Sequence, residues 1–128
     1  MLLALDTSTS LSTLALVDGA RLRAELSVAS EVRHEHTLLP NVETLLGLAG
    51  ASKRDVTAIA VGTGPGGFTS VRVGLATAKG LALGLSVPIV GIPSLRVLAR
   101  AAGPVYGDGR DLRRREHAAR RRRSRPSP

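Results

Sequence analysis

The alternation of hydrophobic and polar residues over the first thirty positions predicts three β-strands. Residues 2–5 form a short apolar run, and residues 12–17 form a second strand candidate. Asp18 and Gly19 follow, a pair that supplies the positive-φ conformations of a tight hairpin turn. Over residues 22–28, aliphatic and polar residues then alternate with a period of two, which is typical of a strand with one buried face. We therefore predict three antiparallel strands.

The pattern then changes to a helical period. Pro40 fits only in the first turn of a helix, because backbone N–H groups there have no hydrogen-bond partner within the helix and the N–H that proline lacks is not needed. The predicted helix therefore begins near residues 36–37 and ends near Gly50. Its apolar residues follow the i, i+3, i+4, i+7 spacing of one helix stripe, namely Leu38, Leu39, Val42, Leu45, Leu46 and Ala49.

The rest of the domain alternates strands with helices. Residues 56–61 are a compact β-branched run, typical of a buried strand, and a glycine-rich segment follows them. A second helix is predicted from about residue 69 to 84, a fifth strand over 87–92, and a short helix from Ser94 to about residue 102. The order β-β-β-α-β-α-β-α predicts an α/β fold with a mixed five-stranded sheet and helical crossovers.

Charge divides the 128 residues into a nearly neutral part and a strongly basic part. Residues 103–128 contain nine arginines and three acidic residues, a net of +6, whereas residues 1–102 contain nine basic and seven acidic residues, a net of +2. The basic part has too few apolar residues to offset the entropy of ordering. We predict one domain over residues 1–102 and a basic, disordered tail over residues 103–128.

Composition also limits the compartment and the chemistry. The chain has no cysteine, which excludes a disulfide framework and a thiolate nucleophile and suits a reducing cytosol. No apolar run reaches the roughly 18–20 residues that a bilayer span requires. No basic segment precedes the apolar start of the chain, so it does not look like a signal peptide. We expect a cytoplasmic protein that makes no membrane contact.

The glycine loop after the fourth predicted strand is the most informative motif. It consists of Gly62, Gly64, Pro65, Gly66, Gly67, Phe68 and Thr69. Three of its glycines satisfy G-x-G-x-x-G between a strand and a helix, as a dinucleotide site requires. The acidic residue expected about 20 positions later is missing, however, and Phe68 stands where a Walker motif has lysine. The loop is either a tight turn that permits close backbone approach, to its own chain or a partner, or a nucleotide contact.

The turn after the first strand is a second candidate site. Asp6, Thr7, Ser8 and Thr9 place a carboxylate beside hydroxyls and turn N–H groups, a combination that suits a phosphate or a hydrated magnesium ion. The alternative is an Asx or Ser/Thr turn that bonds only its own backbone. Four residues alone leave both interpretations open, and the second is favoured.

His34, Glu35 and His36 are the third candidate. A metal site needs three or four ligands, and the only other histidine, His117, lies in the predicted tail. We expect no metal site here, and we interpret the segment as a polar helix entrance.

The predicted second helix contains an unusual ridge of small residues. Ala76, Gly80 and Gly84 recur every four positions, and Gly74 and Ala78 form a parallel row. A glycine inside a helix costs about 1 kcal/mol relative to alanine, so these glycines require an explanation. One explanation is the close approach of another backbone, which belongs either to the protein's own sheet or to another subunit.

Three segments together resemble a known family. ALDTSTS at the start, HTLLPNVETLLGLAG in the first helix and GTGPGGFTSVRVGLATAKGLALGLSVPIVGIPSL around the glycine loop resemble the bacterial tRNA threonylcarbamoyladenosine biosynthesis protein TsaB (YeaZ) family, over roughly residues 1–102. The resemblance implies the actin/Hsp70/sugar-kinase fold, which is ribonuclease H-like. It also implies a non-catalytic subunit that pairs with the catalytic TsaD and the ATPase TsaE to modify the adenosine next to the tRNA anticodon.

The resemblance further implies where partners and cofactors bind. The family's pairing surface is a helix bundle of the first two helices, which maps onto Leu38, Leu39, Val42, Leu45, Leu46, Arg72, Ala76, Lys79 and Gly80. The same surface would allow a homodimer when TsaD is absent. In the wider superfamily the Asp6 turn is the first phosphate-binding element, but a complete nucleotide site needs a second domain. We therefore expect that this chain alone binds no cofactor, while the wider complex uses ATP and magnesium.

The arginine-rich end departs from the family pattern. Its composition is what a GC-rich gene yields when read out of frame, so we favour a frameshifted or truncated reading over a genuine basic extension. Two alternative functions remain open. One is a nucleic-acid-binding module acting through the tail, with steep salt dependence and little sequence preference. The other is a remnant nucleotide-dependent ATPase or kinase-like domain.

Overall fold

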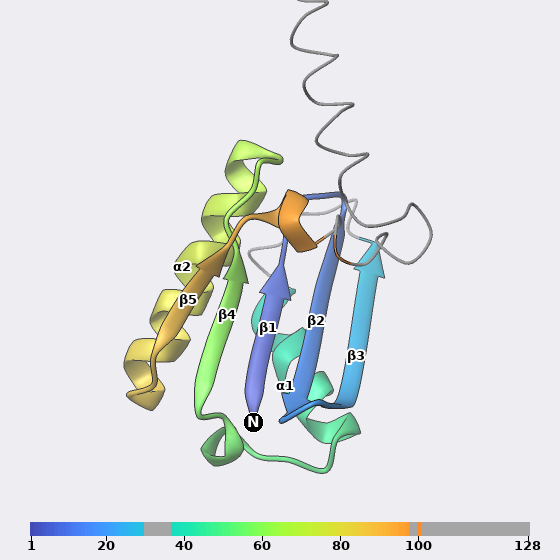
Figure 1. The fold of residues 1–128 in the computed structure, drawn as a ribbon, viewed down its shortest axis with the longest axis vertical. Coiled ribbons are helices and arrows are strands. Elements are labelled where there is room, and N and C mark those ends of the chain that lie inside the picture. Colours follow the sequence, from blue (N-terminus) through green and yellow to red (C-terminus); the bar gives the residue numbers. More distant parts are fainter. Residues whose placement is uncertain (30–36, 98–99, 101–128) are drawn as a thin grey trace, which may run out of the picture. The chain divides into compact units, whose positions relative to one another are not determined.

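The computed structural model describes residues 1–29, 37–97 and 100 (Figure 1). The chain divides into two units, Met1–Ser94 and Leu95–Pro128. The histidine pair near residue 35 and the predicted tail lie outside the described residues. The domain boundary predicted near residue 102 also lies there, so it stays a prediction.

The first unit is built on a mixed five-stranded sheet with the strand order β3-β2-β1-β4-β5 (Figure 1). Strands β1 (Leu2–Asp6), β2 (Leu11–Asp18) and β3 (Arg21–Ala29) are antiparallel neighbours. Strands β4 (Ala58–Gly62) and β5 (Ile89–Ile92) continue the sheet in parallel with β1. The predicted α/β fold with a mixed five-stranded sheet is confirmed.

The hairpin between β2 and β3 forms where the sequence predicts it. Asp18 pairs with Arg21 across the turn, and Gly19 adopts a φ of +59°. A register shift follows at Leu16 and Val17. Such a bulge increases the local right-handed twist of the ribbon.

Helices α1 (Leu38–Leu48) and α2 (Phe68–Leu85) cover the same face of the sheet (Figure 1). Helix α1 begins after Thr37 and has Pro40 in its first turn, as the sequence predicts. Helix α2 ends at Ser86, which adopts a left-handed conformation with φ 54°. The inward side chains of both helices pack on the inward face of β1, β2 and β4 and form the core. Each large aliphatic side chain buried there contributes about 1.5–3 kcal/mol.

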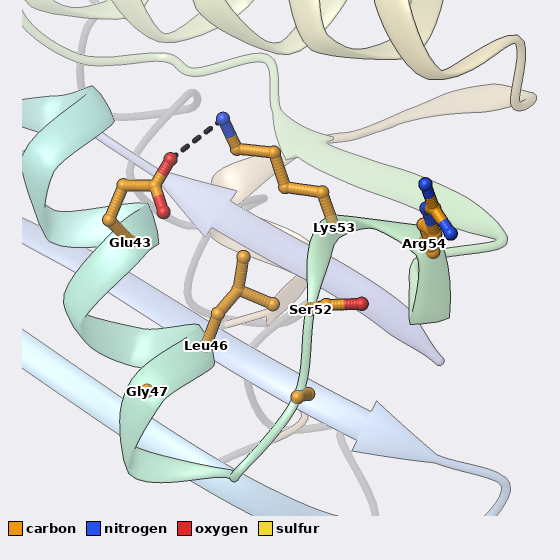
Figure 2. Close-up of a pocket in the computed structure, with 7 residues that line it drawn as sticks. Glu43, Leu46, Gly47, Ser52, Lys53 and Arg54 are labelled. Atoms are coloured by element: carbon orange, nitrogen blue, oxygen red, sulfur yellow. Dashed lines mark ion pairs between the residues drawn. The ribbon is translucent and has the colours of Figure 1, made fainter.

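The link from α1 to β4 contains a turn that the sequence analysis missed. Residues Lys53–Asp55 form a short 3-10 turn (η2), whose start is capped reciprocally by Ser52 and Asp55. Lys53 Nζ lies 2.7 Å from Glu43 Oε1 and so ties the turn to α1 (Figure 2). Because this turn occupies residues 53–55, β4 begins at Ala58, two residues later than predicted.

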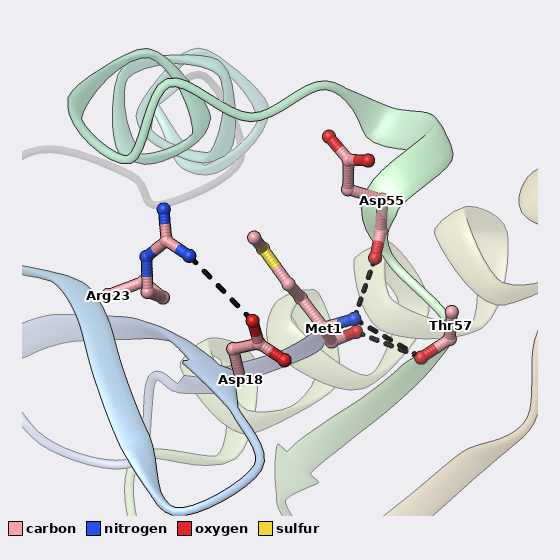
Figure 3. A network of polar contacts seen from close by, with 5 residues as sticks. All are labelled: Met1, Asp18, Arg23, Asp55 and Thr57. Carbon is pink, nitrogen blue, oxygen red and sulfur yellow. Dashed lines mark hydrogen bonds and ion pairs between the residues drawn. The ribbon is translucent and has the colours of Figure 1, made fainter.

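The start of β1 is bound to the start of β4 (Figure 3). The α-ammonium group of Met1 donates to the backbone carbonyl of Asp55 at 2.7 Å and to Thr57 Oγ1 at 3.3 Å. The backbone N–H of Thr57 donates in return to the carbonyl of Met1 at 2.8 Å. Near the β2–β3 turn, Arg23 pairs with Asp18 at 3.7 Å. The contacts of Met1 with Asp55 and Thr57 set the register of the two parallel strands that lead to the candidate sites.

Helical backbone follows β5 directly. Residues 94–97 and residue 100 are helical, which agrees with a short helix starting at Ser94. Its predicted end near residue 102 lies outside the described residues. Among the helices of the described residues, none is both long and apolar enough to span a bilayer.

Candidate functional site

The Asp6 turn and the glycine loop meet at the carboxyl ends of β1 and β4. Asp6 Oδ1 accepts a hydrogen bond from the backbone N–H of Ser8 at 2.7 Å, which closes an Asx turn. Thr7 Oγ1 donates to the carbonyl of Ser70 at 2.6 Å, in the first turn of α2. The backbone N–H of Gly67 donates to the carbonyl of Ser8 at 3.2 Å. The two motifs are therefore bonded to each other.

Two of the loop glycines are required by this contact. A Cβ on Gly62 would clash with the carboxylate of Asp6, and a Cβ on Gly66 would clash with the backbone of Ser8. Glycine is the residue that lets two backbones approach so closely. This geometry favours the tight-turn interpretation of the loop, with its own chain as the partner.

Three of the backbone N–H groups around this turn already have partners within the domain. A phosphate cradle needs backbone N–H groups that point outward with no other partner. Here the N–H of Ser8 donates to Asp6 Oδ1 and the N–H of Gly67 donates to the carbonyl of Ser8. The N–H of Gly64 donates to Ser94 Oγ at 3.1 Å. The described residues also contain no group of three or more His, Asp or Glu side chains arranged to bind a metal ion.

Helix α1 requires a correction to the predicted interface. Four of its five predicted contact residues, Leu38, Val42, Leu45 and Leu46, are at most 3% exposed. They pack on the sheet and form the inward stripe of the helix. They are therefore not available to a partner, and only Leu39, which is 53% exposed, remains on the outside.

Helix α2 presents the other predicted residues to solvent. Phe68 and Leu83 are 75% and 83% exposed, and Arg72, Ala76, Lys79 and Gly80 are exposed between them. Residues three and four positions apart lie on one helix face. We call this face the outer stripe of α2, and it consists of Phe68, Arg72, Ala76, Lys79, Gly80, Leu83 and Gly84. Sequence analysis missed Leu83 and Phe68 as parts of this surface, although their spacing from Arg72 and Gly80 indicates it.

An apolar groove lies between α1 and α2 beside the outer stripe. Its volume is about 680 Å³, and we call it the α1–α2 groove. It is lined by Leu39, Lys53, Ala76, Thr77, Gly80, Leu81, Gly84 and Leu85. A second hollow of about 540 Å³ lies on the other side of Lys53, against the C-terminal half of α1 (Figure 2). The Lys53–Glu43 ion pair lies at the rim of this hollow, so the positive charge of Lys53 already has an acidic partner.

The small residues of α2 lie in two different environments. A Cβ on Gly74 would clash with Thr7 Oγ1, so packing within the domain requires this glycine. Apart from the nearby backbone of α2 itself, no atom of the described residues lies within 4 Å of the position that a Cβ would take on Gly80 or on Gly84. Packing within the described residues thus gives no reason for these two glycines, and both line the α1–α2 groove.

Comparison with solved structures defines the class of protein. YeaZ from Pseudomonas aeruginosa superposes with a TM-score of 0.75 at 40% sequence identity, over 80% of this chain and 48% of that one. The fold is thus an α/β domain of the actin-like ATPase type.

Sequence comparison then gives the family. The family model described as TsaD, tRNA N6-adenosine threonylcarbamoyltransferase, matches residues 27–110. The chain therefore belongs to this family, and it is a homologue of the N-terminal part of TsaB, also called YeaZ. The predicted resemblance is confirmed.

Individual relatives show how far the match extends. The tRNA threonylcarbamoyladenosine biosynthesis protein TsaB of Escherichia coli strain K12 is 38% identical over 111 residues, which are 87% of this chain and 48% of the relative. TsaB of Haemophilus influenzae is 39% identical over 101 residues, or 79% of this chain and 42% of the relative. The chain thus spans about half the length of the curated relatives that it matches.

Proposed function

We propose that this chain is a non-catalytic subunit that supports TsaD in the threonylcarbamoyladenosine modification of tRNA, at the adenosine next to the anticodon. The α1–α2 groove carries the proposal, because it is an apolar surface that the domain leaves uncovered. Family membership supports it, since TsaB relatives are named for this biosynthesis. TsaD is the proposed partner at the groove, and TsaE is the proposed third component.

The groove suits a protein partner in shape and chemistry. Its walls are the aliphatic side chains of Leu39, Leu81 and Leu85, and its floor is open beside Gly80 and Gly84. Burying exposed aliphatic side chains contributes about 25 cal/mol per Å² of apolar area. A helix backbone of the partner can approach the two glycines closely because no Cβ intervenes. Without TsaD, the same groove offers a second copy of this chain a place to pair.

The chain's own role is structural. The N–H groups of Ser8, Gly64 and Gly67 are bonded within the domain, which supports our proposal that this chain alone binds no nucleotide. We propose that ATP and magnesium act in the wider complex, in the cytoplasm. The same bonds weigh against the alternative of an independent ATPase or kinase.

The test is a bulky substitution in the groove. Gly80→Trp should abolish co-purification with TsaD, because the indole fills the space that the partner needs. Gly47→Trp is the matched control, since Gly47 is also an exposed helical glycine with open space around its Cβ position but lines the other hollow. Circular dichroism should show that both variants are folded.

The result that would overturn the proposal is equally direct. If folded Gly80→Trp still co-purifies with TsaD as well as the Gly47→Trp control does, the groove is not the interface. Charge substitutions at Leu45 cannot serve this purpose, because Leu45 is fully buried and such a variant would unfold.

A further inference from the structure

An exposed aromatic–cation pair lies at the N-terminal end of α2. Phe68 is the only phenylalanine of the chain and is 75% exposed. The guanidinium carbon of Arg72, one helical turn later, lies 5.1 Å from the centroid of the Phe68 ring. Stacking on an aromatic face restricts the guanidinium to one orientation while leaving its N–H edge free to donate. The pair thus places the N–H donors of the Arg72 guanidinium next to the apolar ring of Phe68.

We infer that the Phe68–Arg72 pair anchors a carboxylate-bearing segment of a protein partner. The inference rests on the proposed function, because the pair extends the surface of the α1–α2 groove. Phe68, Arg72, Ala76 and Gly80 follow one another at four-residue intervals along one ridge of α2, and because each step turns about 40° around the helix, the pair lies to one side of the groove wall. A partner that covers the outer stripe of α2 as well as the groove contacts the pair.

The charges of α2 indicate a carboxylate. Helix α2 contains Arg72 and Lys79 and no Asp or Glu. Within the described part of the chain, neither cation forms an ion pair. The guanidinium fork matches a carboxylate in two parallel hydrogen bonds, which are stronger than neutral ones. Aromatic residues and arginine are also the types that most often dominate binding energy at protein interfaces.

The same charges argue against nucleic acid at this face. Binding along a phosphate backbone relies on several cations that neutralise successive phosphates. The outer stripe offers only Arg72 and Lys79, and the neighbouring Lys53 is paired with Glu43. Two isolated cations on an otherwise apolar and glycine-rich face suit a protein surface with one or two acidic groups.

The experiment is a calorimetric titration of the full chain with TsaD at two salt concentrations. Arg72→Glu should weaken binding by at least about tenfold and reduce its salt dependence, because it removes an interface hot spot and repels the carboxylate. Phe68→Ala should weaken binding as well, and Arg72→Lys should recover only part of the loss because it lacks the planar fork. Arg21→Glu, an exposed charge reversal on β3, is the control and should change affinity by less than about twofold.

The possible outcomes separate this inference from the proposed function. If the wild type binds TsaD and the Arg72→Glu and Phe68→Ala variants bind equally well, the anchor is refuted while the proposed function stands. If the wild type does not bind TsaD, the proposed function fails and the inference fails with it. If Arg72→Glu leaves TsaD binding intact but weakens the chain's affinity for tRNA, the pair contacts nucleic acid and the inference is overturned.

Discussion

At the scale of single residues, the glycines of α2 show that one residue type can serve two purposes in one helix. Gly74 faces the Asp6 turn, where a side chain would collide with Thr7 Oγ1. Gly80 faces outward, with open space at its Cβ position. Spacing in the sequence places the two glycines in two parallel rows of small residues, but it does not specify which residue lies opposite each row. That neighbour is set by a contact between β1 and α2, more than sixty residues apart.

These two glycines give a matched prediction for the stability of the isolated chain. Gly74→Ala should lower the free energy of unfolding by about 1–3 kcal/mol, because the added methyl group overpacks the contact with Thr7. Gly80→Ala should raise it by up to about 1 kcal/mol, because alanine has the higher helix propensity and the space is free. Urea denaturation of both variants measures the difference, and equal shifts of the same sign would contradict the assigned environments.

Among the secondary-structure elements of the first unit, β2, β3 and the two helices are predicted by periodicity because each buries one face, whereas β1 and β4 are predicted as short apolar runs. Strand β4 begins two residues later than predicted, because Val56 caps the 3-10 turn with its N–H on the carbonyl of Lys53. The direction in which α1 faces was predicted less well. An apolar stripe shows which residues share a face. It does not show whether the sheet or a partner subunit buries that face.

The two faces of α1 should therefore respond differently to truncation. Leu45→Ala should destabilise the chain by about 2–5 kcal/mol, because Leu45 is fully buried against the sheet and its loss leaves a cavity. Leu39→Ala should change stability by less than about 0.5 kcal/mol, since this side chain is half exposed. Leu39→Ala should instead weaken co-purification with TsaD, because Leu39 forms one wall of the α1–α2 groove.

Thermal unfolding and a pull-down with TsaD check both halves of this prediction. A large loss of stability in Leu39→Ala would mean that α1 lies in a different rotation on the sheet. Unchanged binding of that variant, with its fold intact, would remove α1 from the proposed interface and leave α2 as the contact.

The chain as a whole corresponds to about half the length of its relatives, and its Asp6 turn and glycine loop are bonded to each other. Asp6 Oδ1 accepts a hydrogen bond from the backbone N–H of Ser8, and the loop N–H of Gly67 donates to the carbonyl of Ser8. A nucleotide that entered this turn would first have to break those bonds. We therefore predict no saturable binding of magnesium–ATP below about 1 mM and no ATP turnover by the purified chain.

The arginines of residues 103–128 complicate this measurement, because they attract any polyphosphate. Binding through them should disappear at high salt, since exposed charges are screened within about 10 Å at 0.1 M ionic strength and more closely above it. Asp6→Asn should leave such binding unchanged. A titration of both forms at low and high salt thus distinguishes the two sources. Salt-resistant binding that Asp6→Asn alters would show that the turn opens to accept a nucleotide, and our proposal that this chain alone binds none would be wrong.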